Sequence, residues 1–145
     1  MRTVLVTTLV VVLTGGLGVL CASGPKGEKP SVANMPPVVV KTVPESGDTR
    51  VNAGKVKEIL VTFSKDMTDK SWSWSQISDD TSPKRTGEIH YQPNKRTCVF
   101  PCELEPGKTY VFWLNSVKFG NFMDVDGRSA VPYLLVFETK PDKGK

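Results

Sequence analysis

Residues 104–115, LEPGKTYVFWLN, hold the signals that decide the fold. The Pro106-Gly107 pair sets the φ angles of a tight turn between two strands. From Tyr110 onward, the side chains alternate between two faces with the period of a β-strand and not of a helix. Tyr110 opens this strand, a position that suits a buried ring whose hydroxyl bonds to nearby backbone, as in a tyrosine corner. The stretch therefore predicts a turn followed by a β-strand.

Short β-rich runs of the same kind occupy most of the remaining chain, and clusters of turn-forming residues separate them. We expect seven strands, at 38–43, 56–63, 71–77, 87–91, 97–100, 109–117 and 133–139. No stretch shows a convincing amphipathic helix. The fold class is therefore all-β, and the number and length of the strands favour an immunoglobulin-like antiparallel β-sandwich of about seven strands. A small closed barrel is the alternative.

Composition and charge limit the classes of protein to which the chain can belong. The 145 residues are 39% apolar and 23% charged, which is the balance of one ordinary globular domain. The formal net charge of +4 is too small for a strongly basic nucleic-acid clamp, so we expect no nucleic-acid partner. A single histidine excludes a histidine-rich metal site. With no catalytic set marked elsewhere, we expect neither an enzyme nor a cofactor.

Residues 1–23 have the three-part pattern of a secretory signal peptide. Arg2 is their only charge, an apolar stretch follows, and small residues end it. An uncleaved membrane anchor is an alternative, because the apolar run at 3–22 is just long enough to span a bilayer. Lipidation of Cys21, as in bacterial lipoproteins, is another, although Leu20 stands where a small residue is expected.

The rest of the chain divides into three parts. We place a flexible linker at 24–35, the folded domain at 36–140 and a basic tail at 141–145. The expected location is the periplasm, the cell surface or the extracellular space. Contact with a membrane would come only through an uncleaved signal or a lipid on Cys21.

Four short motifs occur in order along the predicted domain. They are PVVVKTVPESG at 37–47, ILVTFSKDM at 59–67, LEPGKTY at 104–110, and DGR at 126–128 followed by FET at 137–139. Together they resemble the bacterial Ig-like domain of the S-layer-protein (SbsA) type, over residues 36–140. The resemblance implies an Ig-like sandwich of the kind found in exported and surface proteins. Two stretches, 70–85 and 118–128, depart from the family pattern, and we expect any specific binding surface to lie there.

Cys98 and Cys102 are the cysteines that remain after the signal, and an exported compartment permits them to pair. Four residues along a regular strand separate two Cα atoms by roughly 13 Å, too far for a disulfide. A bond therefore requires that Pro101 turn the chain. The sequence leaves two alternatives open, a disulfide or two independent thiols.

Trp72 and Trp74 lie two residues apart, so both indoles fall on one face of a predicted strand. If they are exposed, they form a ligand face that can stack on sugars or anchor a peptide or protein. If they are buried, they fill the core, as a tryptophan commonly does in Ig-type sandwiches. We favour the core, and more strongly so for Trp113.

The candidate metal ligands are few. Asp124 and Asp126 begin like a calcium loop but lack its remaining ligands, so we expect an Asx-type turn instead. His90 has no second histidine beside it, and we expect it on a strand surface. The opening strand and the Phe-Ser strand also resemble, more distantly, periplasmic copper-carrier sandwiches. Their metal sites use an N-terminal histidine together with further histidine and aspartate ligands. This chain has His90 as its one histidine, so it lacks that set of ligands.

Three functions follow, in descending order of support. The first is a non-enzymatic exported Ig-like module with structural or protein-interaction roles at the bacterial cell envelope, bound to an envelope protein or glycan. The second is a carbohydrate- or peptide-binding accessory domain that uses exposed Trp72 and Trp74. The third is a periplasmic metal carrier.

Overall fold

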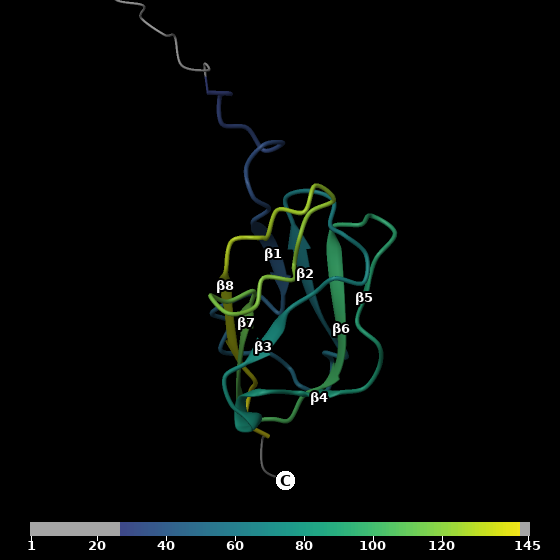
Figure 1. Cartoon of the computed structure of the whole chain (residues 1–145). Coiled ribbons are helices and arrows are strands. Elements are labelled where there is room, and N and C mark those ends of the chain that lie inside the picture. Colours follow the sequence, from purple (N-terminus) through teal and green to yellow (C-terminus); the bar gives the residue numbers. More distant parts are fainter. Residues whose placement is uncertain (1–26, 143–145) are drawn as a thin grey trace, which may run out of the picture.

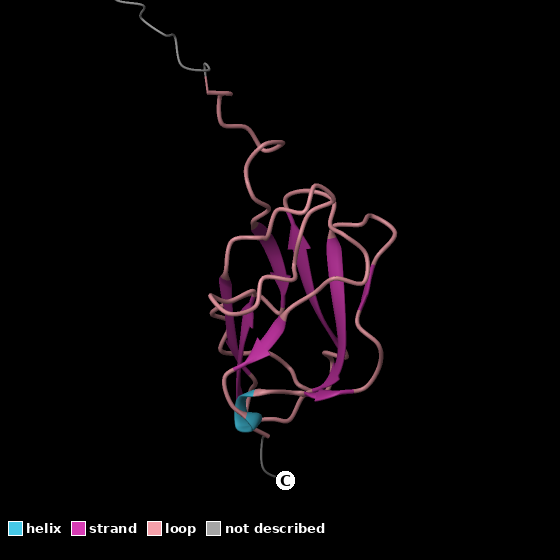
Figure 2. Cartoon of the chain, viewed as in Figure 1, coloured by secondary structure: helices cyan, strands magenta, loops and turns pink. Residues whose placement is uncertain are grey.

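Two antiparallel sheets face each other in the computed structural model, which describes residues 27–142 (Figure 1, Figure 2). The first sheet has the order β1-β2-β6-β4, with β5 also paired to β6, and the second has the order β3-β7-β8. The strands are β1 (Val39–Val43), β2 (Glu58–Phe63), β3 (Trp74–Gln76), β4 (Lys84–Arg85), β5 (His90–Tyr91), β6 (Thr97–Glu103), β7 (Thr109–Leu114) and β8 (Tyr133–Glu138), with one 3-10 turn, η1 (Asp79–Thr81). The predicted all-β sandwich is confirmed. Within the described residues, no helix is long and apolar enough to cross a membrane.

Strand β6 does not end at Phe100, as the sequence predicts, but runs through Pro101 to Glu103. The Cys102 N–H donates to the Lys57 carbonyl on the β2 side, and backbone groups alternate sides along a strand. The nitrogen of Pro101 therefore faces β4 and β5, where it donates nothing. The Thr86 N–H still donates to the Pro101 carbonyl at 3.0 Å, and residues 87–89 loop out between β4 and β5. The sequence missed β4 because a strand of two residues has no periodicity.

Strand β7 carries the predicted alternation, and Tyr110 makes the predicted corner. The Tyr110 ring is buried, and its hydroxyl accepts a hydrogen bond of 2.7 Å from the Glu105 N–H. Tyr110, Phe112 and Leu114 point inward, so Trp113 points outward, next to Leu134, with 37% of its surface exposed. The prediction that Trp113 is a core residue is wrong, because the period of a strand forces neighbours of buried residues to the opposite face.

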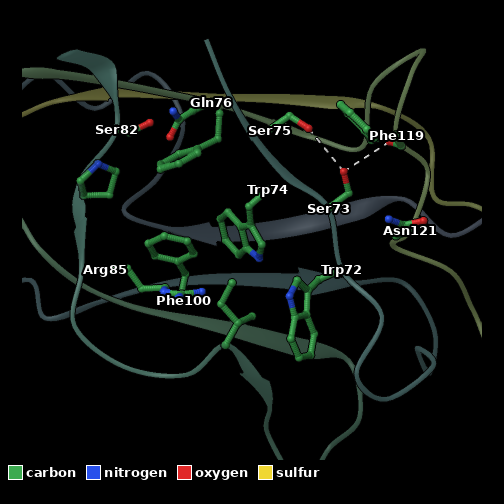
Figure 3. Close-up of a pocket in the computed structure, with 13 residues that line it drawn as sticks. Trp72, Ser73, Trp74, Ser75, Gln76, Ser82, Arg85, Phe100, Phe119 and Asn121 are labelled. Atoms are coloured by element: carbon green, nitrogen blue, oxygen red, sulfur yellow. Dashed lines mark hydrogen bonds between the residues drawn. The ribbon is translucent and has the colours of Figure 1, made fainter. Parts of the chain in front are cut away.

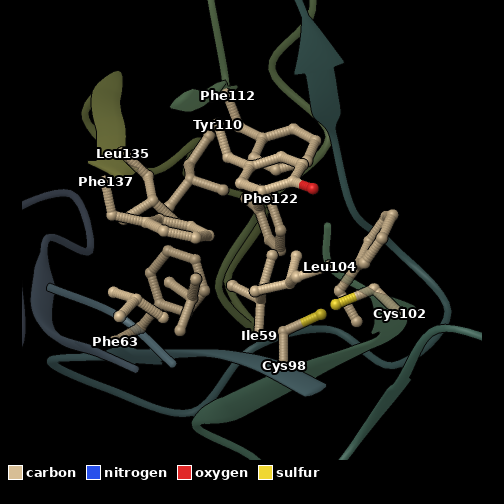
Figure 4. Close-up of a cluster of buried hydrophobic side chains, with 14 of the residues drawn as sticks. Ile59, Phe63, Cys98, Cys102, Leu104, Tyr110, Phe112, Phe122, Leu135 and Phe137 are labelled. Carbon is tan, nitrogen blue, oxygen red and sulfur yellow. The ribbon is translucent and has the colours of Figure 1, made fainter. Parts of the chain in front are cut away.

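The core fills the space between the two sheets (Figure 4). Its largest fully buried side chains include Tyr110, Phe63, Phe122, Phe137 and Ile59. Phe122 comes from the loop between β7 and β8 and packs against Phe63, with 5.0 Å between the ring centroids. The long loop at 118–128 is thus tied to the core and is not a free surface excursion.

The two open sides of the sandwich differ. On the β8 side, the chain leaves β1 and crosses to the second sheet, where residues 46–51 cover the outer edge of β8. Gly47 donates to the Val136 carbonyl at 2.6 Å, and Glu138 donates to the Asp48 carbonyl at 2.8 Å. On the other side, β3 is the edge of its sheet and faces β4 and β5 across a gap. No described segment other than β7 pairs with β3.

Candidate functional site

The gap between β3 and the β4–β5 edge is a groove on the surface of the domain. It consists of a pocket of about 650 Å³ that continues into a second of about 720 Å³. The two pockets share Trp72, Arg85 and Ile89. We call the whole feature the β3–β4 groove. Residues from both stretches that depart from the family pattern line it. The first stretch contributes residues 72–76, Ser82, Pro83 and Arg85, and the second contributes Phe119 and Asn121 at the rim.

Trp72 and Trp74 both line the groove, but they do not form the exposed pair that a stacking platform requires. Both are half-buried and pack against the core. The Trp74 ring lies 5.0 Å from Phe100 and 5.7 Å from Phe112, centroid to centroid. Figure 3 shows Trp74 at the centre of the groove floor, with Trp72 to one side and Arg85 and Phe100 to the other. Trp74 is thus mainly a core residue, and Trp72 forms part of the groove wall.

Arg85 is the functional candidate that the sequence did not reveal. It lies directly opposite Cys102 in the β4–β6 register. Because cross-strand partners share a face of the sheet, and Cys102 is buried in the core, the Arg85 side chain starts on the core side and enters the groove. No carboxylate of the described chain lies within ion-pair distance of its guanidinium, whereas its neighbour Lys84, on the outer face, pairs with Glu103 at 3.6 Å.

Tyr91 lies at one end of the groove. Its hydroxyl donates a hydrogen bond of 3.1 Å to the Ser71 carbonyl, which joins β5 to the segment before β3. Burial raises the pKa of Tyr91 well above its ordinary value, with smaller contributions from Cys98 and Asp69. Tyr91 therefore remains a neutral hydrogen-bond donor and holds the two sheets together there. A further pocket of about 500 Å³, which Tyr91 and Met67 line, adjoins the groove at this end.

The rim of the groove is positioned by hydrogen bonds between the two departing stretches. The Ser71 hydroxyl donates to the Asn121 carbonyl, and the Ser73 hydroxyl donates to the Phe119 carbonyl at 3.4 Å. Phe119 is half exposed, with the Lys118 ammonium 5.2 Å from its ring centroid. The two stretches that depart from the family pattern therefore lie side by side and form one surface. What that surface binds is a separate question.

The predicted Asx-type turn at Asp124 is present. Its carboxylate accepts hydrogen bonds from the backbone N–H groups of Asp126 and Arg128, at 3.1 and 2.8 Å. Lys65 and the Arg128 guanidinium pair with it, at 3.1 and 3.3 Å. Burial alone would raise the pKa of the carboxyl, but these hydrogen bonds and charges outweigh it and hold the pKa below its ordinary value. The site is filled by cations of the protein itself.

The same cluster anchors the end of the expected linker. Lys65 donates to the carbonyls of Ala33 and Met35, at 3.0 and 2.6 Å, and Arg128 donates to Ala33 at 3.1 Å. Residues 31–35 form a hydrogen-bonded turn of their own. The ordered domain therefore begins before residue 36, and this part of the expected flexible linker belongs to the fold. The predicted signal at 1–23, with Cys21, and residues 143–145 of the tail lie outside the described residues.

Cys98 and Cys102 are both buried and free. The turn at Pro101 that a disulfide requires is absent, because β6 continues through this position as a strand. Of the two alternatives, the structure has the independent thiols. Burial raises the pKa of Cys98 to about 12 and that of Cys102 to about 11, so both are neutral core groups at physiological pH.

A protein-family model covers most of the described domain. The family model described as "Bacterial Ig-like domain" matches residues 33–139. The chain belongs to this family. The match begins within the turn that Lys65 and Arg128 anchor, in agreement with the earlier start of the ordered domain. The SbsA subtype stays a prediction.

Solved structures resemble this bacterial Ig-like domain to different degrees. CopC from Methylosinus trichosporium OB3b matches with a TM-score of 0.56 and 18% identity, over 75% of this chain and 98% of CopC. The S-layer protein rSbsC(31-844) matches with a TM-score of 0.48 and 16% identity, over 74% of this chain and 14% of its own. The SbsC structure of domains 1–6 gives the same values. No curated protein matches the chain.

The candidate metal ligands of this Ig-like domain are dispersed. His90 lies exposed on β5, with its Nδ1 3.1 Å from the Glu88 carbonyl, whereas Cys98 is in the core. Met67 is buried, and Met35 is exposed. Within residues 27–142, no group of three or more His, Cys, Asp or Glu side chains is arranged to hold a metal ion.

Proposed function

We propose that the chain is an exported, non-enzymatic Ig-like module that acts through structural or protein interactions at the bacterial cell envelope. The observation that carries the proposal is the β3–β4 groove, an open surface lined by the exposed Arg85, which has no carboxylate partner in the described chain. Membership of the bacterial Ig-like family and the signal-like pattern of residues 1–23 support it. The carbohydrate-binding alternative is weaker, because Trp72 and Trp74 are both half-buried and Trp74 packs against Phe100.

Export is tested by the fate of the full chain in a bacterial host. We expect the protein in the periplasmic, envelope or extracellular fraction, with an intact mass that corresponds to cleavage after Ser23 or to acylation at Cys21. A variant without residues 1–23 is the control and should stay in the cytoplasm. An uncleaved, unacylated chain found only in the cytoplasm would overturn the proposal.

The interaction role is tested by sedimentation of the processed protein with purified envelope fragments. We expect wild type to sediment with them and Trp72→Ala together with Arg85→Gln to weaken the association. Trp113→Ala is the matched control, since it removes an exposed indole from the opposite face of β7, away from the groove. If wild type shows no association, or if Trp113→Ala weakens it and the groove variants do not, the groove is not the binding surface.

A further inference from the structure

The free edge of β3 presents backbone groups that are available for pairing. The Asn115 N–H donates to the Ser73 carbonyl at 3.2 Å, so residues 73 and 75 form the hydrogen-bonded pairs with β7. The N–H and C=O groups of Trp74 and Gln76 therefore point away from β7, toward the groove. Two residues of a strand span about 6.7 Å, so these groups match the spacing of another extended chain.

The groove also fixes where a charge of the occupant would lie. Of the two pockets that form the groove, the one of about 650 Å³ beside β3 has Arg85 as its one charged lining residue within the described chain, whereas the second also carries Asp69, Lys70 and Glu88. The Arg85 guanidinium has no carboxylate within ion-pair distance among the described residues. A side chain opposite Trp74 or Gln76 on an added strand would point to the core side, which is also the side of Arg85. A carboxylate at that position complements the pocket.

We propose that the β3–β4 groove binds an extended peptide segment, which adds as a fourth strand to the β3-β7-β8 sheet and places a carboxylate against Arg85. This inference rests on the proposed function and names its class of partner. Trp72, Ile89 and Phe119 supply apolar contacts for the side chains on either side of the carboxylate. Affinity comes from the main chain and selectivity from the side chains, as in other cases of strand addition.

An extended peptide fits these observations better than a sugar. Stacking on sugars needs an exposed aromatic face, and both groove indoles are half-buried with Trp74 packed against Phe100. The hydroxyl groups of a sugar do not repeat at the spacing of a strand, whereas the N–H and C=O groups of an extended peptide do. The hydrogen bond from Tyr91 to Ser71 joins the two sides at one end of the groove, so the added segment lies on the Arg85 side of this bond.

The experiment uses the processed full-length protein and three matched peptides. The first is acetyl-TVTETVT-amide, whose valines and central glutamate lie on one face of a strand. The second replaces the glutamate with glutamine, and the third keeps every side chain but carries methyl groups on the valine and glutamate nitrogens. Binding is measured by isothermal titration calorimetry, and contact is located by the amide chemical shifts of Trp74 and Gln76. An oligogalacturonate serves as the acidic glycan probe.

We expect the glutamate peptide to bind and to shift the Trp74 and Gln76 amides. The glutamine peptide should bind about tenfold more weakly, because it loses a charge-assisted contact. The N-methylated peptide should lose binding, because it cannot donate to β3. On the protein side, Arg85→Gln should weaken binding of the glutamate peptide about tenfold and Arg85→Lys less. Lys84→Gln is the control on the opposite face and should have no effect.

Three results would overturn the inference. Equal binding of the N-methylated peptide would exclude strand addition, and equal binding to Arg85→Gln would exclude the charge contact. Binding of the oligogalacturonate that depends on Arg85, with none of the peptides bound, would assign the groove to acidic glycans. If wild type still sediments with envelope fragments in any of these cases, the proposed function stands and only the peptide inference fails.

Discussion

Asp124 and Arg85 are two charged side chains in contrasting positions, because Asp124 is fully buried and neutralised by the protein itself, whereas Arg85 is exposed at the groove. The Asp124 carboxylate is fully buried and is held by Lys65, Arg128 and two backbone N–H groups. Arg85 enters an open groove and has no carboxylate within ion-pair distance in the described chain. A charge is tolerated in a closed interior only with partners, whereas a charge at an open rim keeps its water. The first charge therefore holds the fold together, and the second is free to meet a ligand.

The largest effect is expected when the paired charge is removed. Asp124→Ala leaves Lys65 without its carboxylate and should lower the free energy of unfolding by about 3–5 kcal/mol, measured by urea unfolding. Asp124→Asn should cost less, because its carbonyl can still accept from the Arg128 N–H. Asp126→Ala, which removes an exposed carboxylate, is the control and should cost less than about 1 kcal/mol. Equal losses for Asp124→Ala and Asp126→Ala would show that the buried, paired carboxylate contributes no more to stability than the exposed one.

A smaller effect is expected at the corner. Tyr110→Phe keeps the buried ring but leaves the Glu105 N–H without its acceptor, so the free energy of unfolding should fall by about 1 kcal/mol. Tyr133→Phe, at a half-buried tyrosine on β8, is the matched control. Thermal and urea unfolding should rank the two variants in the same order. A Tyr110→Phe protein as stable as wild type would show that the corner bond contributes nothing.

The Asp124 carboxylate should also make the free energy of unfolding depend on pH. The pKa of Asp124 is lowered in the folded state, so the unfolded chain binds a proton more readily. The resulting stabilisation is present above the ordinary value of 3.8 and is lost as the pH falls through the folded value. Urea unfolding between neutral pH and pH ~3 should show this loss in wild type and a flatter profile in Asp124→Asn. Parallel profiles would contradict it.

The smallest effect is expected at the unpaired charge. Arg85→Gln should change the free energy of unfolding by no more than about 0.5 kcal/mol, because no ion pair of the described chain is broken. Its amide spectrum should match that of wild type outside the groove. A loss as large as that of Asp124→Ala would make Arg85 a structural residue and would remove it from the binding surface.

Much of the architecture was predictable because it depends on local patterns. The alternation after Tyr110, the Pro106-Gly107 turn and the Asx-type turn at Asp124 are short-range features of the chain, and all are present. The outward position of Trp113 is also implicit in the same alternation, and the prediction is wrong because it weighs the apolar neighbours of Trp113 above its register. Hydrophobic residues can remain at the surface when the period of a strand places them there.

The site was only half predictable. The sequence marked 70–85 and 118–128 as departures from the family pattern, and the fold brings both stretches to one groove. It did not mark Arg85, because nothing in a charged loop shows that one side chain will stand opposite the buried Cys102. It also left Cys98 and Cys102 undecided, since a proline ends some strands and is accepted beside an interrupted edge in others.

The sequence by itself determined the class of structure, seven of the eight strands of the described chain and the corner at Tyr110, because turn chemistry and a period of two act between near neighbours. Only the tertiary structure decided which edge stays open and which charge is neutralised. Residues 46–51 cover β8, Asp124 meets Lys65, and Arg85 meets no carboxylate in the described chain. These outcomes depend on how distant segments are brought together in space, which no local pattern encodes.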